Sequence, residues 1–150
     1  MLLLGKFDND GNATITIRVD GNSGFKDYAA IIDTGFSGFV ALPMLDMVEL
    51  GLKTEGAANV TLGDGSTTVN LISSGLVTLG SQAEIGTIIL DEKSTDVLVG
   101  MALLREFKLA LILTNNAIVL YDENETIDAI TGFMGAAPQG QPNTAPTVTE

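Results

Sequence analysis

Short runs of hydrophobic residues, separated by glycine, asparagine and aspartate, recur along most of the chain. Over residues 14–19 the polar positions alternate strictly with Ile15, Ile17 and Val19. A period of two puts alternate side chains on opposite faces of a β-strand, so that one face is polar and the other apolar. Such runs predict strands over residues 1–8, 13–19, 27–33, 59–62, 67–79, 84–90, 97–99, 109–113 and 117–121.

Three of the breaks between these strands are typical of hairpin turns. Asp10-Gly11, in the first break, supports the positive φ values of tight β-turns. The second hairpin turns through residues 63–66, and its polar tip with two glycines is expected to be flexible. Gly75, in the long second arm of that hairpin, indicates a bend or a bulge. The third hairpin turns around residues 114–116.

Two segments favour short helices. Pro43 suits the first turn of a helix over residues 43–50, and Gly51 suits its end. Residues 101–107 contain helix-favouring alanine and leucine and follow a glycine. Residues 126–134 fit either a further strand or a docking segment. The many short strands predict one all-β, barrel-like domain over residues 1–134.

The last part of the chain, residues 135–150, has a different composition. It is rich in small and polar residues and holds Pro138, Pro142 and Pro146, which are three of the four prolines in the protein. Such a segment has too little apolar surface to offset the entropy lost on folding. We therefore expect a disordered tail that contains proline, glutamine and threonine.

Two absences from the composition narrow the chemistry. The chain has no cysteine and no histidine. This excludes a thiol nucleophile, a Ser-His-Asp triad and metal sites built from cysteine or histidine. Lysine and tyrosine occur in no suggestive context, so carboxylates are the best remaining acid–base groups for an enzyme. We expect neither a metal nor a cofactor.

The charge and hydropathy of the chain also restrict its partners. The formal net charge is −12, which repels phosphate backbones, so nucleic-acid binding is not expected. No apolar run is long enough to span a membrane. The apolar residues 1–4 are too few for a signal peptide and follow no cationic region. These features predict a soluble, cytoplasmic protein.

One carboxylate lies in an unusual place for a charged group. Asp33 directly follows the apolar residues 29–32, which are expected to be buried on both faces of their strand. A charge at the edge of a core is unfavourable unless it is paired or hydrogen-bonded, and such groups are often kept where chemistry uses them. On its own, the Asp-Thr-Gly triplet at residues 33–35 fits an ordinary turn at the end of a strand equally well.

Three features taken together resemble the retropepsin-like aspartic proteases, which are single-domain relatives of the retroviral proteases. They are the Asp-Thr-Gly triplet at residues 33–35, the glycine-tipped hairpin downstream, and the Leu-Val-Gly segment at residues 98–100 that leads into a helix. The resemblance covers roughly residues 1–121. It implies an all-β fold: a closed β-barrel with a flap hairpin and one or two short helices.

The resemblance also implies roles for individual residues. Asp33 is the expected catalytic aspartate, the hydroxyl of Thr34 is expected to bond across a two-fold axis, and Gly35 is expected to let the backbone approach the substrate. Phe36 replaces the alanine or serine of many relatives and fits either the core or a substrate pocket. Met101 replaces the arginine of retroviral members. The expected flap tip, which would contact substrate, comprises Gly63, Asp64, Gly65 and Ser66.

The implied activity is that of a homodimeric aspartic endopeptidase acting on peptides or proteins. Each chain supplies one Asp33, and two carboxylates held close together share a proton and titrate as a pair. The pair activates a water molecule, which attacks the peptide bond without a metal or a covalent intermediate. Two alternatives stay open: a non-catalytic dimeric β module that binds extended peptide segments, and an inactive subunit that needs a different partner chain.

Overall fold

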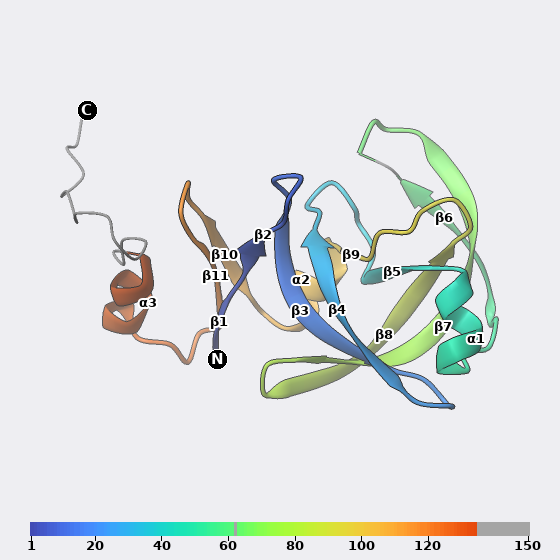
Figure 1. Cartoon of the computed structure of the whole chain (residues 1–150), viewed down its shortest axis with the longest axis horizontal. Helices are drawn as coiled ribbons and strands as arrows, with labels where there is room; N and C mark the ends of the chain where they lie inside the picture. The colour runs from blue at the N-terminus through green and yellow to red at the C-terminus, as the bar shows by residue number, and fades with distance from the viewer. Residues whose placement is uncertain (62, 135–150) are drawn as a thin grey trace.

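The computed structural model describes residues 1–61 and 63–134 and is mostly β (Figure 1). Its strands are β1 (Leu2–Leu4), β2 (Lys6–Phe7), β3 (Ala13–Asp20), β4 (Phe25–Ile32), β5 (Val40–Pro43), β6 (Gly56–Thr61), β7 (Thr67–Leu79), β8 (Gln82–Asp91), β9 (Leu98–Val99), β10 (Ala110–Leu113) and β11 (Ile118–Tyr121). Its helices are α1 (Leu45–Leu50), α2 (Met101–Glu106) and α3 (Ile127–Met134). None of these helices has the length and apolar character needed to cross a membrane.

The strands form two sheets. The larger has the order β2-β3-β4-β9-β5-β8-β7-β6, and the smaller has the order β1-β11-β10. In addition, β3 pairs antiparallel with β7, with Arg18 opposite Thr78 and Asp20 opposite Leu76. This pairing brings strands from distant positions of the larger sheet together and makes the sheet curve back on itself (Figure 1).

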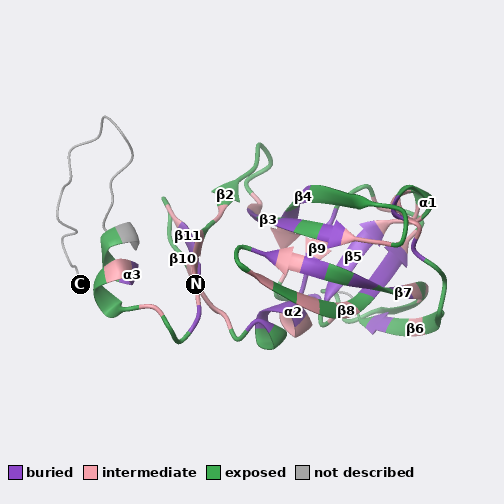
Figure 2. Ribbon diagram, turned by 90° about the horizontal axis from the view of Figure 1, so that it is seen from below, coloured by how far each residue is buried: buried purple, intermediate pink, exposed green. Residues whose placement is uncertain are grey.

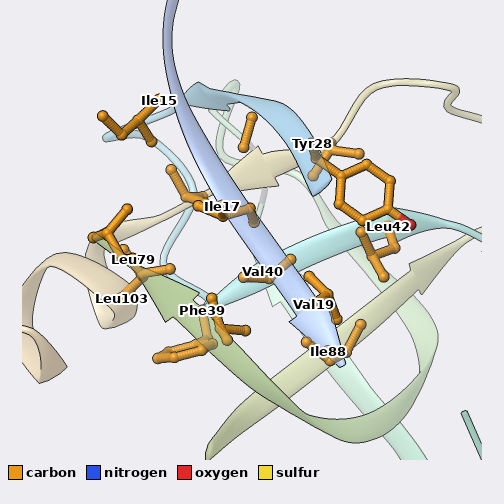
Figure 3. Packing of buried hydrophobic residues seen from close by; sticks show 14 of the residues in the cluster. Ile15, Ile17, Val19, Tyr28, Phe39, Val40, Leu42, Leu79, Ile88 and Leu103 are labelled. Carbon is orange, nitrogen blue, oxygen red and sulfur yellow. The ribbon is translucent and has the colours of Figure 1, made fainter. Parts of the chain in front are cut away.

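The main core lies inside this curved sheet, as the alternation along β3 predicts. Ile15, Ile17 and Val19 are buried (Figure 3), whereas Thr16 and Arg18 on the opposite face are exposed. Figure 2 shows buried and exposed stretches alternating along the strands of this sheet. The sheet's other strands, the segment before β5 and α2 supply further apolar side chains to this cluster, among them Phe39, Val40, Leu79, Ile88 and Leu103. The predicted period of two is therefore confirmed over residues 15–19 of β3, whereas Thr14 on the polar face is buried and its hydroxyl donates to the carbonyl of Lys6.

A second, smaller apolar cluster lies apart from the main core. It consists of the buried residues Phe36, Ala41, Val60 and Ile89, with Ile72 and Leu98 packed against them. These residues come from β5, β6, β7, β8 and β9 and from the segment after β4. The cluster matters for function because it adjoins the segment that carries the Asp-Thr-Gly triplet.

The N-terminal segment differs from its prediction because residues 1–8 form two strands in different sheets. The break is at Gly5, whose backbone N–H donates to the carbonyl of Ile118 over 2.8 Å. A Cβ atom at Gly5 would lie 2.4 Å from the carbonyl oxygen of Thr14. A glycine therefore allows the chain to pass closely between the two sheets, and the strand divides there.

Three further elements differ from the sequence pattern. Pro43 ends β5 and does not begin a helix; α1 starts at Leu45, and β5 itself was not predicted. Residues 127–134 form α3, so a final strand is wrong for this segment. Gly75 produces no bulge, because β7 and β8 stay in continuous register through it. The predicted disordered tail, residues 135–150, and Leu62 lie outside the described residues.

The strand before the triplet is less buried than predicted. In β4, Tyr28 and Ala30 are buried, but Ala29 is exposed, and Ile31 and Ile32 are half-buried. The apolar run is therefore not buried on both faces, since one face of β4 has no covering layer among the described residues.

Candidate active site

Asp33 lies immediately after β4, at a position fixed by β9. The two strands pair in parallel, with Ile31 opposite Leu98 and Ile32 opposite Val99. The backbone N–H of Asp33 continues this ladder by donating to the carbonyl of Val99 over 2.9 Å. On its other side β9 pairs antiparallel with β5. The connection from β4 to β5, residues 33–39, must therefore cross the end of β9.

Backbone hydrogen bonds from the start of helix α2 fix the position of this connecting loop. The N–H groups at the start of a helix have no partner within the helix. Here the N–H groups of Gly100, Met101 and Ala102 donate to carbonyls of the loop at 3.1, 2.9 and 3.1 Å, and these carbonyls belong to Phe39, Phe36 and Gly38 respectively. The 33–39 loop is thus fixed to the first turn of α2 by three backbone hydrogen bonds.

This contact depends on Gly100. A Cβ atom there would lie 2.4 Å from the carbonyl oxygen of Gly38 and 2.5 Å from that of Phe36. Because both neighbours are backbone atoms, a side chain could be accommodated only by moving the loop. The glycine that ends the Leu-Val-Gly segment is therefore required for the close approach of α2 and the loop.

The carboxylate of Asp33 organises its own turn. Its Oδ1 atom accepts a hydrogen bond from the N–H of Gly35 over 3.0 Å, and its carbonyl accepts one from the N–H of Phe36 over 3.1 Å. The local turn expected of an aspartate at a strand end is present. Asp33 is half-buried, and within residues 1–61 and 63–134 it forms no ion pair.

The tip of the β6–β7 hairpin approaches the same loop. A Cβ atom placed on Gly35 would lie 3.5 Å from the Cα atom of Gly63. In the tip, Oδ1 of Asp64 accepts hydrogen bonds from the N–H and the hydroxyl of Ser66 at 2.9 and 2.6 Å, and these bonds hold the pKa of Asp64 below its ordinary value. Gly65 has a φ of 87°, which glycine adopts readily.

A cavity of about 590 Å³ lies between the β6–β7 hairpin and the second apolar cluster. Its apolar lining includes Phe36, Ala41, Val60, Ile89 and Leu98. The charged residues 91–93 also line it. The cavity can accept an apolar side chain or a similar group.

The geometry described so far can be compared with known structures. No protein-family model matches the chain, and no curated protein sequence matches it. Its structure is similar to the crystal structure of a retropepsin-like aspartic protease from Rickettsia conorii, with a TM-score of 0.57 and 20% sequence identity over 80% of this chain and 90% of that chain. The fold is retropepsin-like. At this identity, the likeness concerns the fold.

Within this retropepsin-like fold, the residues singled out from the sequence lie close to one another but have different surroundings. The triplet at residues 33–35 and Phe36 share one loop, and Gly63 lies against that loop. Residues 64–66 form the exposed hairpin tip. Phe36 fits both interpretations offered for it, because it is buried in the second cluster and also lines the cavity. Asp33 itself does not line the cavity.

Sequence reasoning missed Ala41, Val60 and Ile89 as cavity residues. A signal for two of them is present, since residues 40–42 and 88–90 are uninterrupted apolar runs. Such runs are typical of strands covered on both faces. In β8, for instance, Ile88 and Leu90 face the main core, whereas Ile89 belongs to the second cluster.

Outside the 33–39 loop, the polar groups of the described residues include a further hydrogen-bonded network but no cluster able to hold a metal ion. No group of three or more aspartates and glutamates that could hold a metal ion is found among the residues that the structure describes. A separate carboxylate network joins Tyr28, Asp46 and Lys26; the phenol of Tyr28 donates to Asp46 over 2.6 Å. Burial and this carboxylate raise the pKa of Tyr28 far above its ordinary value, so it stays neutral and ties β4 to α1.

Proposed function

We propose that the protein is an aspartic endopeptidase that acts as a homodimer, with Asp33 from each subunit forming the catalytic pair. The observation that carries the proposal is the position of Asp33, which lies half-buried in a loop held by β9 and α2, next to an apolar cavity and under a hairpin. The retropepsin-like fold supports it. The β3–β7 pairing supports the interpretation of the larger sheet as a closed barrel, and the β6–β7 hairpin is the candidate flap.

A single carboxylate cannot perform this reaction by itself. A two-fold axis close to the 33–35 triplet supplies the second Asp33, and because two carboxylates held close together cannot both ionise without repulsion, the pair shares one proton in its active form. The ionised carboxylate takes a proton from a water held between them, and the resulting hydroxide attacks the peptide carbonyl carbon. The protonated carboxyl donates to the carbonyl oxygen. Collapse of the tetrahedral intermediate breaks the C–N bond, and the departing nitrogen receives a proton from the pair.

The substrate that fits this arrangement is an extended peptide. A strand-like segment lying beneath the hairpin would hydrogen-bond through its backbone, while alternate side chains enter pockets. The cavity beside Phe36 would receive an apolar side chain, because Ala41, Val60, Ile89 and Leu98 line it. The closeness of Gly63 to Gly35 suggests that the hairpin must move for a peptide to enter and that it excludes water once closed.

The first experiment is cleavage of a mixed peptide library by the wild type and by Asp33→Asn, followed by mass spectrometry from about pH 4 to pH 7, where a carboxylate pair changes protonation. Asparagine keeps the hydrogen bond to Gly35 but cannot take a proton. We expect Asp33→Asn to lower the cleavage rate on the order of 10²-fold to 10⁴-fold, the range typical of general acid–base catalysis. Equal cleavage by both proteins would contradict the assigned role.

A second candidate function has an observation in its favour. The turn that Asp33 makes with Gly35 and Phe36 gives this residue a structural role without any catalysis. In that case the protein is a dimeric β module that binds extended peptides. A folded wild-type dimer that binds library peptides without cleaving any, with Asp33→Asn binding the same peptides, would favour this alternative.

A further inference from the structure

A groove lined by Thr34 of the 33–39 loop and by residues of α2 lies beside the candidate catalytic loop. We call it the α2 groove. Its volume is about 320 Å³, and its apolar part includes Met101, Leu104 and Leu111. Thr34, Arg105 and Lys108 also line it, and all three are exposed. The groove therefore combines an apolar surface with two cations directly beside the candidate catalytic loop.

Neither of these two cations has an ion-pair partner among the residues that the structure describes. The chain has seven lysines and arginines against nineteen aspartates and glutamates. Arg18 and Lys26 pair with carboxylates, but among the described residues no carboxylate lies within ion-pair distance of Arg105 or Lys108. In a strongly acidic protein, two unpaired cations beside one apolar groove favour an anionic segment as its occupant.

The backbone at Lys108 gives an independent reason to look for that occupant. Lys108 has a φ of 53°, and it is the one residue other than glycine with a positive φ in the part of the chain that the structure describes. It follows the end of α2, a position that glycine usually occupies because it has no side chain to strain. A strained residue of this kind is often kept because its side chain is used.

The segment that follows β11 has matching properties. We call residues 123–134 the arm. Figure 2 shows α3, which forms most of the arm, at the opposite end of the molecule from β6. Ile130 is buried, but Ile127 is 75% exposed. Glu123 and Asp128 are exposed and form no ion pair with any described residue. By contrast, Glu125 lies 3.7 Å from the amino group of Met1.

We propose that the arm of each subunit lies in the α2 groove of a second copy of this chain. Glu123 and Asp128 pair there with Arg105 and Lys108 of the other subunit, and Ile127 covers the apolar part of the groove. This inference rests on the proposed function, because the catalytic pair requires a two-fold axis near Thr34 and that residue also lines the groove. A two-fold axis makes the contact twice in each dimer.

The contact between arm and groove would offset the electrostatic repulsion between two acidic subunits. Each subunit carries a formal net charge of −12, so two copies repel each other over most of their surfaces. Two sites of opposite charge on each subunit give attraction in one register and repulsion in others. The arm exchange would therefore select the dimer that brings the two Asp33 loops together.

The test is a charge exchange measured by sedimentation equilibrium at one fixed ionic strength. The groove variant is Arg105→Glu with Lys108→Glu, and the arm variant is Glu123→Lys with Asp128→Lys. In each variant alone, groove and arm carry like charges, so we expect its dimer to weaken on the order of 100-fold. An equimolar mixture of the two variants is expected to form a heterodimer and to regain peptide cleavage, because both contacts again join opposite charges.

Two controls keep the result interpretable. Lys6→Glu with Lys53→Glu changes the net charge as much as the groove variant does, but both residues are exposed elsewhere, so dimerisation should fall much less. Lys108→Gly removes one cation and relaxes the positive φ, so it should fold at least as well as the wild type and still weaken the dimer. Circular dichroism and thermal unfolding establish that each variant is folded.

The outcomes separate this inference from the proposed function. A wild type that dimerises and cleaves, together with folded groove and arm variants that dimerise equally well, would overturn the arm exchange and leave the protease proposal in place. If an equimolar mixture of the two weakened variants regained neither dimerisation nor cleavage, the arm exchange would likewise be overturned and the protease proposal would stand. A wild type that stays monomeric at every concentration, and cleaves nothing, would overturn both proposals.

Discussion

At the scale of single residues, Gly100 determines how closely α2 can approach the candidate catalytic loop. The carbonyl oxygens of Gly38 and Phe36 occupy the space that a side chain at Gly100 would need. Gly38 is restricted in a similar way, since a Cβ atom there would lie 2.4 Å from Cζ of the Phe36 ring. The loop and the helix therefore meet backbone to backbone, which keeps Asp33 in a fixed place.

Gly100→Ala should destabilise the protein and displace the loop. Moving two backbone carbonyls in a packed site is expected to lower the free energy of unfolding by about 3 kcal/mol or more. Gly132→Ala is the matched control, because a Cβ atom at Gly132 meets nothing within 4 Å and alanine favours the helix. Urea denaturation of both variants measures the difference. An unchanged stability in Gly100→Ala would contradict the close packing.

The sequence made some of these residues recognisable and left others hidden. Asp33 was conspicuous because a carboxylate followed an apolar run, and Leu-Val-Gly at residues 98–100 was conspicuous through a family resemblance. The role of Gly38 was not accessible, because its contact with Phe36 depends on how the loop folds over β9. That Arg105 and Lys108 pair with no carboxylate of the described residues was hidden for the same reason, since a sequence does not show which charges meet.

At the scale of elements, a buried ion pair joins the start of β1 to the end of β11 and, through Gln82, to the larger sheet. The amino group of Met1, just before β1, lies 2.7 Å from Oδ1 of Asp122, which follows β11. The other carboxylate oxygen of Asp122 accepts from the side-chain amide of Gln82 in β8 over 3.0 Å. The hydrogen bond to the amino group lowers the pKa of Asp122 and raises that of the Met1 amino group.

These pKa directions predict a stability window. The carboxylate stabilises the fold above its ordinary pKa of 3.8, and this contribution is lost as the pH falls through the lower value in the folded state. The amino group stabilises the fold below its ordinary pKa of 8.0, and this contribution is lost as the pH rises through the higher folded value. Thermal unfolding of the wild type and Asp122→Asn should therefore differ most between these two pH values.

The test of the Met1–Asp122 ion pair has a matched control and a result that would contradict it. Asp10→Asn is the control, because it removes an exposed carboxylate in the first hairpin turn that forms no ion pair with any described residue. If the difference between the wild type and Asp122→Asn were the same at pH values below 3.8 and at pH values near neutrality, the ion pair would not be the source of the stability.

Elements with a clear local pattern were predicted well, and those defined by tertiary contacts were not. The alternation in β3, the hairpins and α2 follow from residue spacing and turn residues. Strand β5 is four residues long and pairs only with strands far along the chain, so its short apolar run gave no distinct local signal. Residues 127–134 contain β-branched residues typical of strands, yet they form α3, which packs beside β11.

At the scale of the whole molecule, the proposed reaction depends on self-association. Thr34 is exposed in the single chain and lines the α2 groove next to Met101. If its hydroxyl bonds across the two-fold axis, Thr34→Ala should weaken the dimer by roughly 1–3 kcal/mol, the usual effect of leaving a buried partner without its hydrogen bond. Sedimentation equilibrium measures the change, and Thr95→Ala, in an exposed loop, is the control. Unchanged dimer affinity in Thr34→Ala would exclude this role.

The place of β9 in the larger sheet also has a consequence for biosynthesis. The strand that separates β4 from β5, and the helix whose first N–H groups hold the 33–39 loop, both come far downstream of Asp33 in the chain. A ribosome releases the N-terminal part first, so Asp33 leaves the exit tunnel long before the segments that fix its loop. If the protein has the proposed activity, it cannot act on the nascent proteins around it until the chain has been made through α2, which ends at Glu106.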